Sequence, residues 1–141
     1  MASEFPILLC TQPVSGSLSA ADAAAAVKDG LAVTGRAFDV LELPTSGDRN
    51  ALLNAASFDQ RMRAAFAVVI LTENLSEEHL RASIAAEIAT RARQAGVACH
   101  AICGESSLEP FSARIYDLQT VQVADDAAGF TAAGRRLADL L

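Results

Sequence analysis

The run Phe66-Ala-Val-Val-Ile-Leu71 is entirely apolar and contains three consecutive β-branched side chains. A short apolar run of this kind is typical of a strand whose two faces are both buried. Both faces of a parallel sheet are usually covered by helices. The run therefore predicts the central strand of such a sheet.

Other short apolar or alternating runs lie on both sides of this segment and are separated by Ala-rich amphipathic stretches. The further predicted strands are Phe5–Cys10, Arg36–Leu43, Val97–Cys103 and Thr120–Val123. Strands that alternate with helices in this way indicate βαβ units. We therefore predict one α/β domain over residues 1–141, with three α/β/α layers and an open, mainly parallel five-stranded sheet of the Rossmann or flavodoxin-like type.

Capping signals mark the predicted helices. Ser19 precedes an Ala-rich segment, with Asp22 three residues later, and predicts a helix over residues 20–33 whose last turn is weakened by Gly30. Ser76, followed by two glutamates, predicts a second helix that reaches residue 94 and ends at Gly96. Further helices are predicted within residues 51–65, within residues 110–116, and after a cap at position 125 or 126.

The composition excludes several classes of protein. The chain is 52% apolar, as a globular domain requires, and its 11 basic and 17 acidic residues give a net charge of −6. The absence of a basic run argues against a nucleic-acid partner, and we find neither a signal peptide nor a membrane span in the sequence. Three cysteines are too few for a disulfide framework. We therefore expect a cytoplasmic protein.

Closing the chain is a segment that combines Phe130, Leu137 and Leu141 with small residues. This apolar face could form the seam of a homodimer, because small residues let helices approach closely. Alternatively, the same face covers the sheet. Both possibilities stay open at the level of sequence.

A ligand site in an open parallel sheet is expected outside the carboxyl ends of the strands, where the strand order reverses. The loop of residues 11–18 places Gly16 between Ser15 and Ser17, just before Ser19 at a helix start, and could cradle an anion. Alternatively it is only a Ser/Gly turn that caps the helix. The predicted loops after the other strands add the candidates Asp48, Thr72, Glu73, Asn74 and Gly104. The loop matches neither nucleotide-binding glycine motif.

Cysteine and histidine residues provide no convincing chemistry. Cys10 ends a strand, as a nucleophile could, but no Lys or Arg follows it before position 28, so a buried thiol is the better interpretation. In Cys99-His100-x-x-Cys103 the histidine faces away from the two thiols on a strand, which argues against a metal site. His79 is interpreted as a surface residue. We therefore predict no catalytic residue, no metal site and no cofactor.

Two familiar α/β functions are minor alternatives. A phospho-receiver needs an aspartate at the end of the third strand, where this chain has Thr72. A flavodoxin would bind FMN at the first loop. However, the chain has no Trp and a single Tyr to stack on the flavin ring.

Two groups of segments together resemble type-1 glycerate kinases. The first comprises Gly16-Ser-Leu-Ser-Ala20, a helix ending in Gly-Leu, and Val40-Leu-Glu-Leu-Pro44. The second comprises Ala67-Val-Val-Ile-Leu-Thr-Glu-Asn-Leu75, Leu80-Arg81, residues 86–97 and Cys103-Gly104. Enzymes of this family are far longer, and the missing length would fall between residues 50 and 66. The resemblance implies their Rossmann-like domain without the inserted second domain.

The chain departs from that family where the family has its charges. Ser15 stands where the family has Lys, Thr45-Ser-Gly-Asp-Arg-Asn50 replaces a glycine- and acid-rich motif, and Ser83 aligns with another Lys. In the third loop Thr72, Glu73, Asn74 and Ser76 align with a Glu-Gly-Arg stretch and an Asp of the family. Phosphoryl transfer depends on such cations and on Mg²⁺ ligands.

These departures lead to two functional hypotheses. The first is a binding, scaffolding or regulatory protein without kinase activity, with a weak site for a phosphorylated or carboxylated metabolite or a nucleotide. The alternative is a small-molecule phosphotransferase that an oligomeric partner completes, for example with Arg49 reaching a neighbour's first loop.

Overall fold

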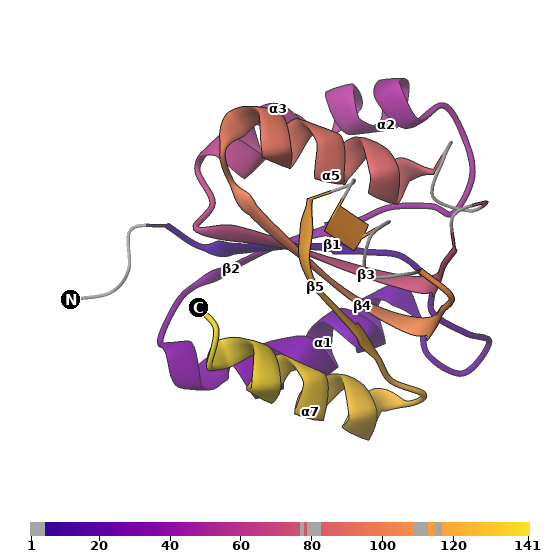
Figure 1. Ribbon diagram of the computed structural model, residues 1–141, viewed down its shortest axis with the longest axis vertical. Coiled ribbons are helices and arrows are strands. Elements are labelled where there is room, and N and C mark those ends of the chain that lie inside the picture. Colours follow the sequence, from indigo (N-terminus) through magenta and orange to yellow (C-terminus); the bar gives the residue numbers. More distant parts are fainter. Residues whose placement is uncertain (1–4, 77, 79–82, 109–112, 115–116) are drawn as a thin grey trace.

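The computed structural model describes residues 5–76, 78, 83–108, 113–114 and 117–141, which form a sheet between two helical layers (Figure 1). The strands are β1 (Ile7–Thr11), β2 (Phe38–Glu42), β3 (Ala67–Leu75), β4 (Ala98–Ser106) and β5 (Leu118–Val123). The helices are α1 (Ala20–Leu31), the short 3-10 turn η1 (Ala32–Thr34), α2 (Arg49–Ala55), α3 (Phe58–Arg63), α5 (Ile84–Ala95) and α7 (Ala127–Ala138). No helix in these described ranges has both the length and the apolar character needed to cross a membrane.

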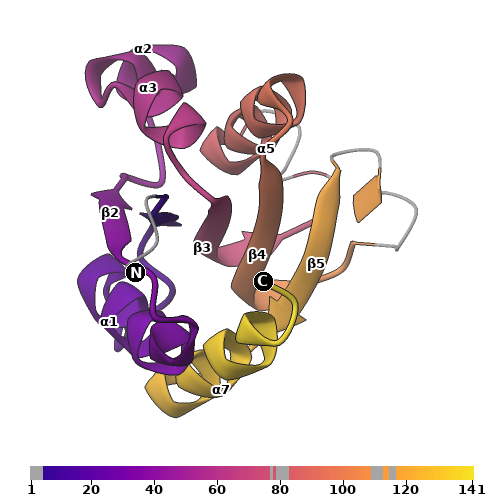
Figure 2. The same ribbon diagram turned by 90° about the vertical axis from the view of Figure 1, so that its left-hand side faces the viewer.

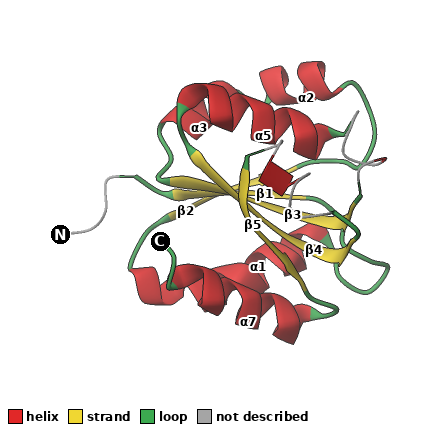
Figure 3. Cartoon of the chain, viewed as in Figure 1, coloured by secondary structure: helices red, strands yellow, loops and turns green. Residues whose placement is uncertain are grey.

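All five strands are parallel and lie in the order β2-β1-β3-β4-β5, which confirms the predicted fold class (Figure 3). The β-branched run that predicted a central strand forms most of β3, which lies in the middle of the sheet. In register, Leu9 of β1 pairs with Val40 on one side and Val69 on the other. The strand order reverses between β1 and β3, which places the expected ligand position at their carboxyl ends.

The two faces of the sheet carry separate hydrophobic cores. Leu8 and Cys10 of β1 face a core that includes side chains of α2, α3 and α5. Ile7 and Leu9 face the opposite way, into a core shared with α1 and α7. Figure 2 shows these two helical layers on opposite sides of the strands, with α1 and α7 side by side. The two-residue period of the strands produces this division.

Helices α1 and α7 pack at backbone distance through two glycines. A Cβ atom added at Gly30 would lie 2.1 Å from the backbone oxygen of Thr131, and one added at Gly134 would lie 2.8 Å from that of Val27. Gly30 therefore allows the contact between the helices, a role beyond the weakening of the last turn expected from its propensity. Phe130 and Leu137 are fully buried, so this face of α7 packs within the chain.

Strands β3 and β4 extend beyond the predicted boundaries. The pairs Thr72↔Cys103 and Asn74↔Glu105 continue the ladder beyond the end of β1. The prediction that Thr72, Glu73, Asn74 and Gly104 lie in loops was therefore wrong, because they belong to this extended ribbon. The polar stretch has low β propensity on its own, and pairing between distant segments places it in the sheet.

Helix α5 begins later than predicted. Its N-cap is Ser83, which has extended backbone angles and accepts a hydrogen bond from the backbone N–H of Ala86. An uninterrupted helix from Ser76 was therefore the wrong prediction. The end at Gly96 is confirmed, with that glycine in the left-handed conformation at φ 73°. His79 and most of the predicted helix at residues 110–116 lie outside the described residues.

Capping predictions for the first and last helices hold. Ser19 accepts a hydrogen bond from the N–H of Asp22 at the start of α1, as predicted. At the start of α7 the cap is Asp126, one of the two residues considered. The segment after β2 forms two short helices: α3 lies within the predicted range of residues 51–65, whereas α2 begins two residues before it, at Arg49.

Candidate functional site

A hollow of about 350 Å³ lies at the carboxyl ends of β1 and β3, where the strand order reverses. Its described lining residues are Gln12, Thr45, Thr72, Glu73, Asn74, Ser83, Ile84 and Ala85. They come from the loops after β1 and β2, from the end of β3 and from the start of α5. The hollow is thus where general rules of parallel sheets place a ligand, on the side of the sheet covered by α2, α3 and α5.

Two buried polar side chains form the floor of this hollow. The Thr72 hydroxyl donates to Gln12 Oε1 at 2.8 Å, and Gln12 Nε2 donates to the carbonyl of Pro44 at 2.8 Å. Both side chains belong to residues that are only 7% exposed. This chain of hydrogen bonds joins β3 to the segments after β1 and β2, which fixes the relative positions of three lining elements.

Asn74 contributes an unused hydrogen-bond acceptor. Its Oδ1 atom is buried and has no hydrogen-bond partner among the described residues. A buried polar atom without a partner costs free energy, on the order of 1–3 kcal/mol, and such atoms are rare. Asn74 lines the hollow, but this oxygen itself is covered by protein atoms.

On the opposite side of the hollow is the N-terminus of α5. Ser83 Oγ accepts from the N–H of Ala86, whereas the N–H groups of Ile84 and Ala85 find no acceptor in the described part of the chain. The first N–H groups of a helix point out of its end and carry partial positive charge. This wall of the hollow can therefore donate to an anionic group.

Glu73 is the one charged side chain among the described lining residues, and it is exposed. It also lines a second, smaller hollow of about 160 Å³, together with Val14, Ser15, Gly104, Glu105 and Asp125. The sequence candidates are therefore divided between two places. Thr72 and Asn74 line the larger hollow, Ser15 and Gly104 line the smaller one, and Glu73 lies between them.

The first loop is largely occupied with its own hydrogen bonds. The N–H of Ser17 donates to Ser15 Oγ at 3.3 Å, and the two hydroxyls lie 3.3 Å apart. The backbone of Ser15 also pairs with Leu18 in both directions. Gly16 is exposed, and a Cβ atom there would meet no atom within 4 Å. This loop folds as a self-paired turn, so few of its donors face a ligand.

Two further candidates are helix caps. Ser19 caps α1, and Asp48 Oδ1 accepts hydrogen bonds from the N–H groups of Asn50 and Ala51 at the start of α2. Both side chains therefore use acceptor capacity on their own helices. Neither is among the described residues that line the larger hollow.

The cysteines are buried and keep their protons. Burial raises the pKa of Cys10, raises that of Cys99 to about 12, and raises that of Cys103 to about 11. A thiol with so high a pKa is a poor nucleophile at neutral pH. Cys99 and Cys103 face the α5 side of the sheet, as the strand alternation predicted.

His100 lies on the other face of β4. Its Nδ1 atom is 2.8 Å from the Thr120 hydroxyl, and the residue is 3% exposed. Thr120 shares a face of β5 with Gln122, whose amide donates to a carbonyl of α7. Burial lowers the pKa of His100, so the neutral form is favoured in the folded protein.

Sequence reasoning missed Gln12 and did not connect Ser83 with the site. Gln12 follows directly after an apolar strand next to the reversal point, and this position is a usable signal. Ser83 precedes an amphipathic segment and could have been recognised as a helix cap. However, the two glutamates that follow Ser76 made Ser76 the stronger candidate for that cap. The local pattern therefore favoured Ser76, whereas the start of α5 depends on where β3 ends.

No family model matches the chain, and no curated protein shows a significant match to it. The fold class of the chain is therefore established, a five-stranded parallel α/β sheet, but its family is not.

Proposed function

We propose that this protein binds a small polar metabolite in the hollow between β1, β3 and α5, and that it acts by binding rather than by phosphoryl transfer. The observation that carries the proposal is the hollow itself. It lies at the strand-order reversal and combines the buried pair Gln12 and Thr72, the amide of Asn74 and two N–H groups of α5 that have no acceptor among the described residues. A concave site with a small number of convergent polar groups is typical of small-molecule pockets.

The lining residues argue against kinase chemistry. No lysine or arginine occurs among the described residues that line the hollow, and the charge of Glu73 has the same sign as a phosphate. Loss of one group that stabilises the transferring charge costs about 10²–10³ in rate, so loss of several leaves little activity. The resemblance to type-1 glycerate kinases fits this proposal as a single-domain relative that keeps the sheet but not the charges.

Nearby arginines serve the fold. Arg61 makes a two-pronged ion pair with Asp39, and Arg91 pairs with Glu87 and Asp59. Moving either guanidinium into the hollow would break these interactions. The alternative of a phosphotransferase completed by a partner chain therefore needs a cation other than these two arginines.

Thermal-shift and calorimetric titration with inorganic phosphate, carboxylic acids, amino acids and nucleotides tests the proposal. A ligand present at 100 times its Kd raises the free energy of unfolding by about 2.7 kcal/mol, which is readily measured. We expect at least one compound to bind and Thr72→Val to weaken it at least tenfold, because the floor of the hollow loses its hydroxyl.

The matched control is Ser17→Ala, which removes a hydroxyl from the exposed first loop. It should leave the affinity unchanged. A ligand that responds to Ser17→Ala but not to Thr72→Val would move the site to the first loop. No binding by any compound, or ATP turnover with a three-carbon acid that Thr72→Val abolishes, would contradict the proposal.

A further inference from the structure

The two edge strands of the sheet differ in how they are protected from pairing with another chain. β2 contains two acidic residues, Asp39 and Glu42, and the Arg61 guanidinium donates to the Val40 carbonyl at 3.1 Å. Charges and covered backbone groups of this kind discourage the addition of a further strand. β5, with the sequence Leu-Gln-Thr-Val-Gln-Val, has neither a charge nor a proline.

The outer backbone groups of β5 are unpaired. The ladder with β4 is regular over residues 120–123, and the N–H of Ala124 donates to the Cys103 carbonyl at 2.9 Å. Successive residues of a strand direct their backbone groups to opposite edges, so Val121 and Val123 direct theirs away from β4. Neither of these two backbones has a hydrogen-bond partner on that side within the described ranges.

A groove of about 590 Å³ lies beside this edge and has an apolar floor. Leu118 belongs to the core on the α5 side of the sheet, and Leu108, Ala113 and Val121 pack against that core. Val123 faces the same side as Val121 and is 51% exposed. Figure 2 shows β5 as the last strand of the sheet, with α5 above neighbouring β4. The floor of the groove is therefore open beside the unpaired edge.

Arg114 gives the groove a positive charge. Its side chain lines the groove, is exposed, and makes no ion pair within the described ranges. A guanidinium can hold a carboxylate through two parallel hydrogen bonds. Charge complementarity therefore favours an occupant that carries a carboxylate at this end of β5.

We propose that β5 is the docking site for an extended segment of a partner protein, which adds a sixth strand to the sheet. The backbone of this segment pairs with Val121 and Val123, its apolar side chains at every second position pack on the floor of the groove, and a carboxylate pairs with Arg114. In strand addition, main-chain hydrogen bonds provide affinity and alternate side chains provide specificity. This surface is separate from the hollow, so the inference does not depend on the proposed function.

Synthetic peptides test the docking site on the intact protein. The probes are the acetylated and amidated peptides Glu-Val-Thr-Val-Thr-Val and Val-Thr-Val-Thr-Val-Glu, which let a strand of either direction reach Arg114. We expect at least one to bind in calorimetric titration, and its Gln counterpart to bind about three- to tenfold more weakly. N-methylation of single peptide bonds should abolish binding at every second position only, because alternate N–H groups pair with β5.

Variants place the peptide on the edge. Val123→Pro removes an N–H that the sheet itself does not use, so the fold should persist while peptide affinity falls about tenfold or more. Val123→Thr keeps that N–H and the shape of the side chain, and should change the affinity less than about threefold. Arg114→Gln should weaken the acidic peptide about three- to tenfold, whereas Arg135→Gln, on an exposed arginine of α7, should leave it unchanged.

The pattern of N-methylation uses the wild-type protein, so it decides the question even where Val123→Pro does not fold. The proposal is overturned if neither peptide binds, if N-methylation has no alternating effect, or if Thr72→Val abolishes binding and so places the peptide in the hollow. A concentration-dependent dimer in sedimentation that Val123→Pro abolishes would also overturn it, because a second copy of the chain would then occupy this edge.

Discussion

The two helical layers are joined in different ways, although both cover the same sheet. Helices α1 and α7 meet through Gly30 and Gly134, so their backbones touch. In the other layer, the guanidinium of Arg91 on α5 reaches Asn54 of α2 and Asp59 of α3. Backbone contact leaves no space for a ligand, whereas helices bridged by long side chains can stand apart. The hollow of about 350 Å³ at the ends of β1 and β3 lies on the bridged side.

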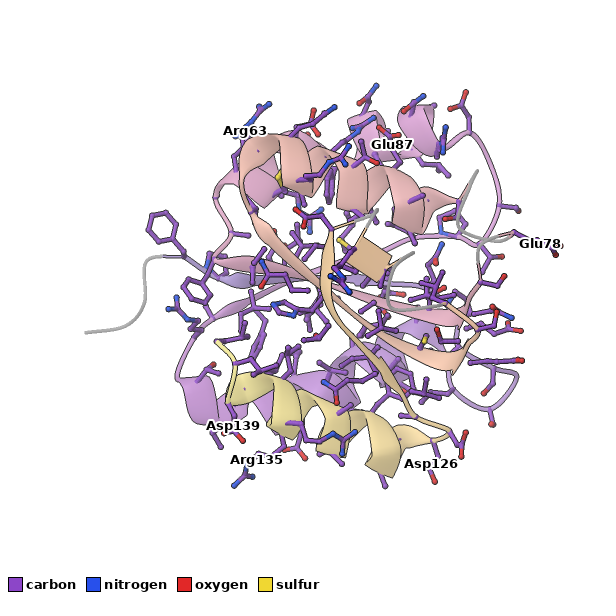
Figure 4. The ribbon with its side chains drawn as sticks, in the orientation of Figure 1. Arg63, Glu78, Glu87, Asp126, Arg135 and Asp139 are labelled. Atoms are coloured by element: carbon purple, nitrogen blue, oxygen red, sulfur yellow. The ribbon has the colours of Figure 1, made fainter. Side chains whose placement is uncertain are left out.

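Figure 4 shows the same contrast at the outer surfaces. Glu87, a partner of Arg91, lies on the α5 side of the sheet, whereas Asp126, Arg135 and Asp139 project from the far side, at α7. Glu87 pairs with Arg91 within α5, and Arg91 in turn reaches α2 and α3. Substitutions at these contacts show whether the two layers depend on the different interactions that their geometry indicates.

The largest effect is expected from Gly30→Ala in α1. Intrinsic helix propensity alone predicts a gain of about 1 kcal/mol. Packing predicts the opposite sign, because the new Cβ atom would lie 2.1 Å from the Thr131 oxygen and 2.7 Å from the Arg135 nitrogen. Overpacking at backbone distance costs about 1–3 kcal/mol or more, so we expect a net loss of about 2 kcal/mol in urea unfolding.

Gly16→Ala is the control for that substitution, since its Cβ atom would meet nothing within 4 Å. It should change the free energy of unfolding by less than about 0.5 kcal/mol. A Gly30→Ala protein as stable as the wild type would show that the two helices can separate at little cost, and the contrast between the layers would lose its basis.

Gly30 also shows which parts of the fold the sequence could predict. Local patterns correctly placed the five strands, the caps at Ser19 and Asp126 and the end of α5 at Gly96, because each depends on neighbouring residues. The role of Gly30 depends on α7, more than 90 positions away in the sequence, as the Thr131 contact shows. Propensity alone therefore describes that glycine as a weakness.

The candidate site was predictable in position but not in composition. The reversal point follows from strand order, and Thr72 and Asn74 were named as candidates near it. Gln12 belongs to the site because its amide reaches the Pro44 carbonyl. Ser83 belongs to it because β3 extends to Leu75 and α5 therefore starts later. Both depend on pairing between distant segments, which local sequence patterns do not encode.

An intermediate loss of stability is expected from Arg91→Ala, which removes the side chain that connects α5 with α2 and α3. Its guanidinium donates to Glu87, Asp59, Asn54 and Asn50, and the side chain is 12% exposed. Charged hydrogen bonds that are partly open to water support a loss of about 1–2 kcal/mol in urea unfolding. Arg91→Lys should recover less than half, because one ammonium group cannot reproduce the planar fork.

Arg63→Ala is the matched control, because Arg63 is exposed on neighbouring α3. It should alter stability by less than about 0.5 kcal/mol. Equal losses for Arg91→Ala and Arg63→Ala would show that the bridge contributes nothing specific. Arg91→Ala should also lower the affinity of the protein for the ligand of the hollow, whereas Gly16→Ala should leave that affinity unchanged.

The smallest expected change in stability is its dependence on pH, which comes from His100. This residue is buried against Thr120 on the α1–α7 side of the sheet. Burial lowers the pKa of His100 in the folded protein, so the unfolded chain binds the proton more readily. The contribution of neutral His100 to stability is therefore complete above the pKa of the unfolded chain, about 6.5. It is lost as the pH falls from that value toward the lower pKa of the folded protein. Between pH 7.5 and 6 we expect this to remove less than about 1 kcal/mol.

Urea unfolding of the wild type and His100→Asn at several pH values measures this contribution. The variant can keep a polar atom near the Thr120 hydroxyl but does not titrate, so it should be less stable at pH 7.5 and show a flatter dependence below pH 7. His79 and all carboxylates are present in both proteins, so their effects cancel in the difference. Parallel curves for the two proteins would mean that His100 accepts its proton without disturbing the sheet, which would contradict this prediction.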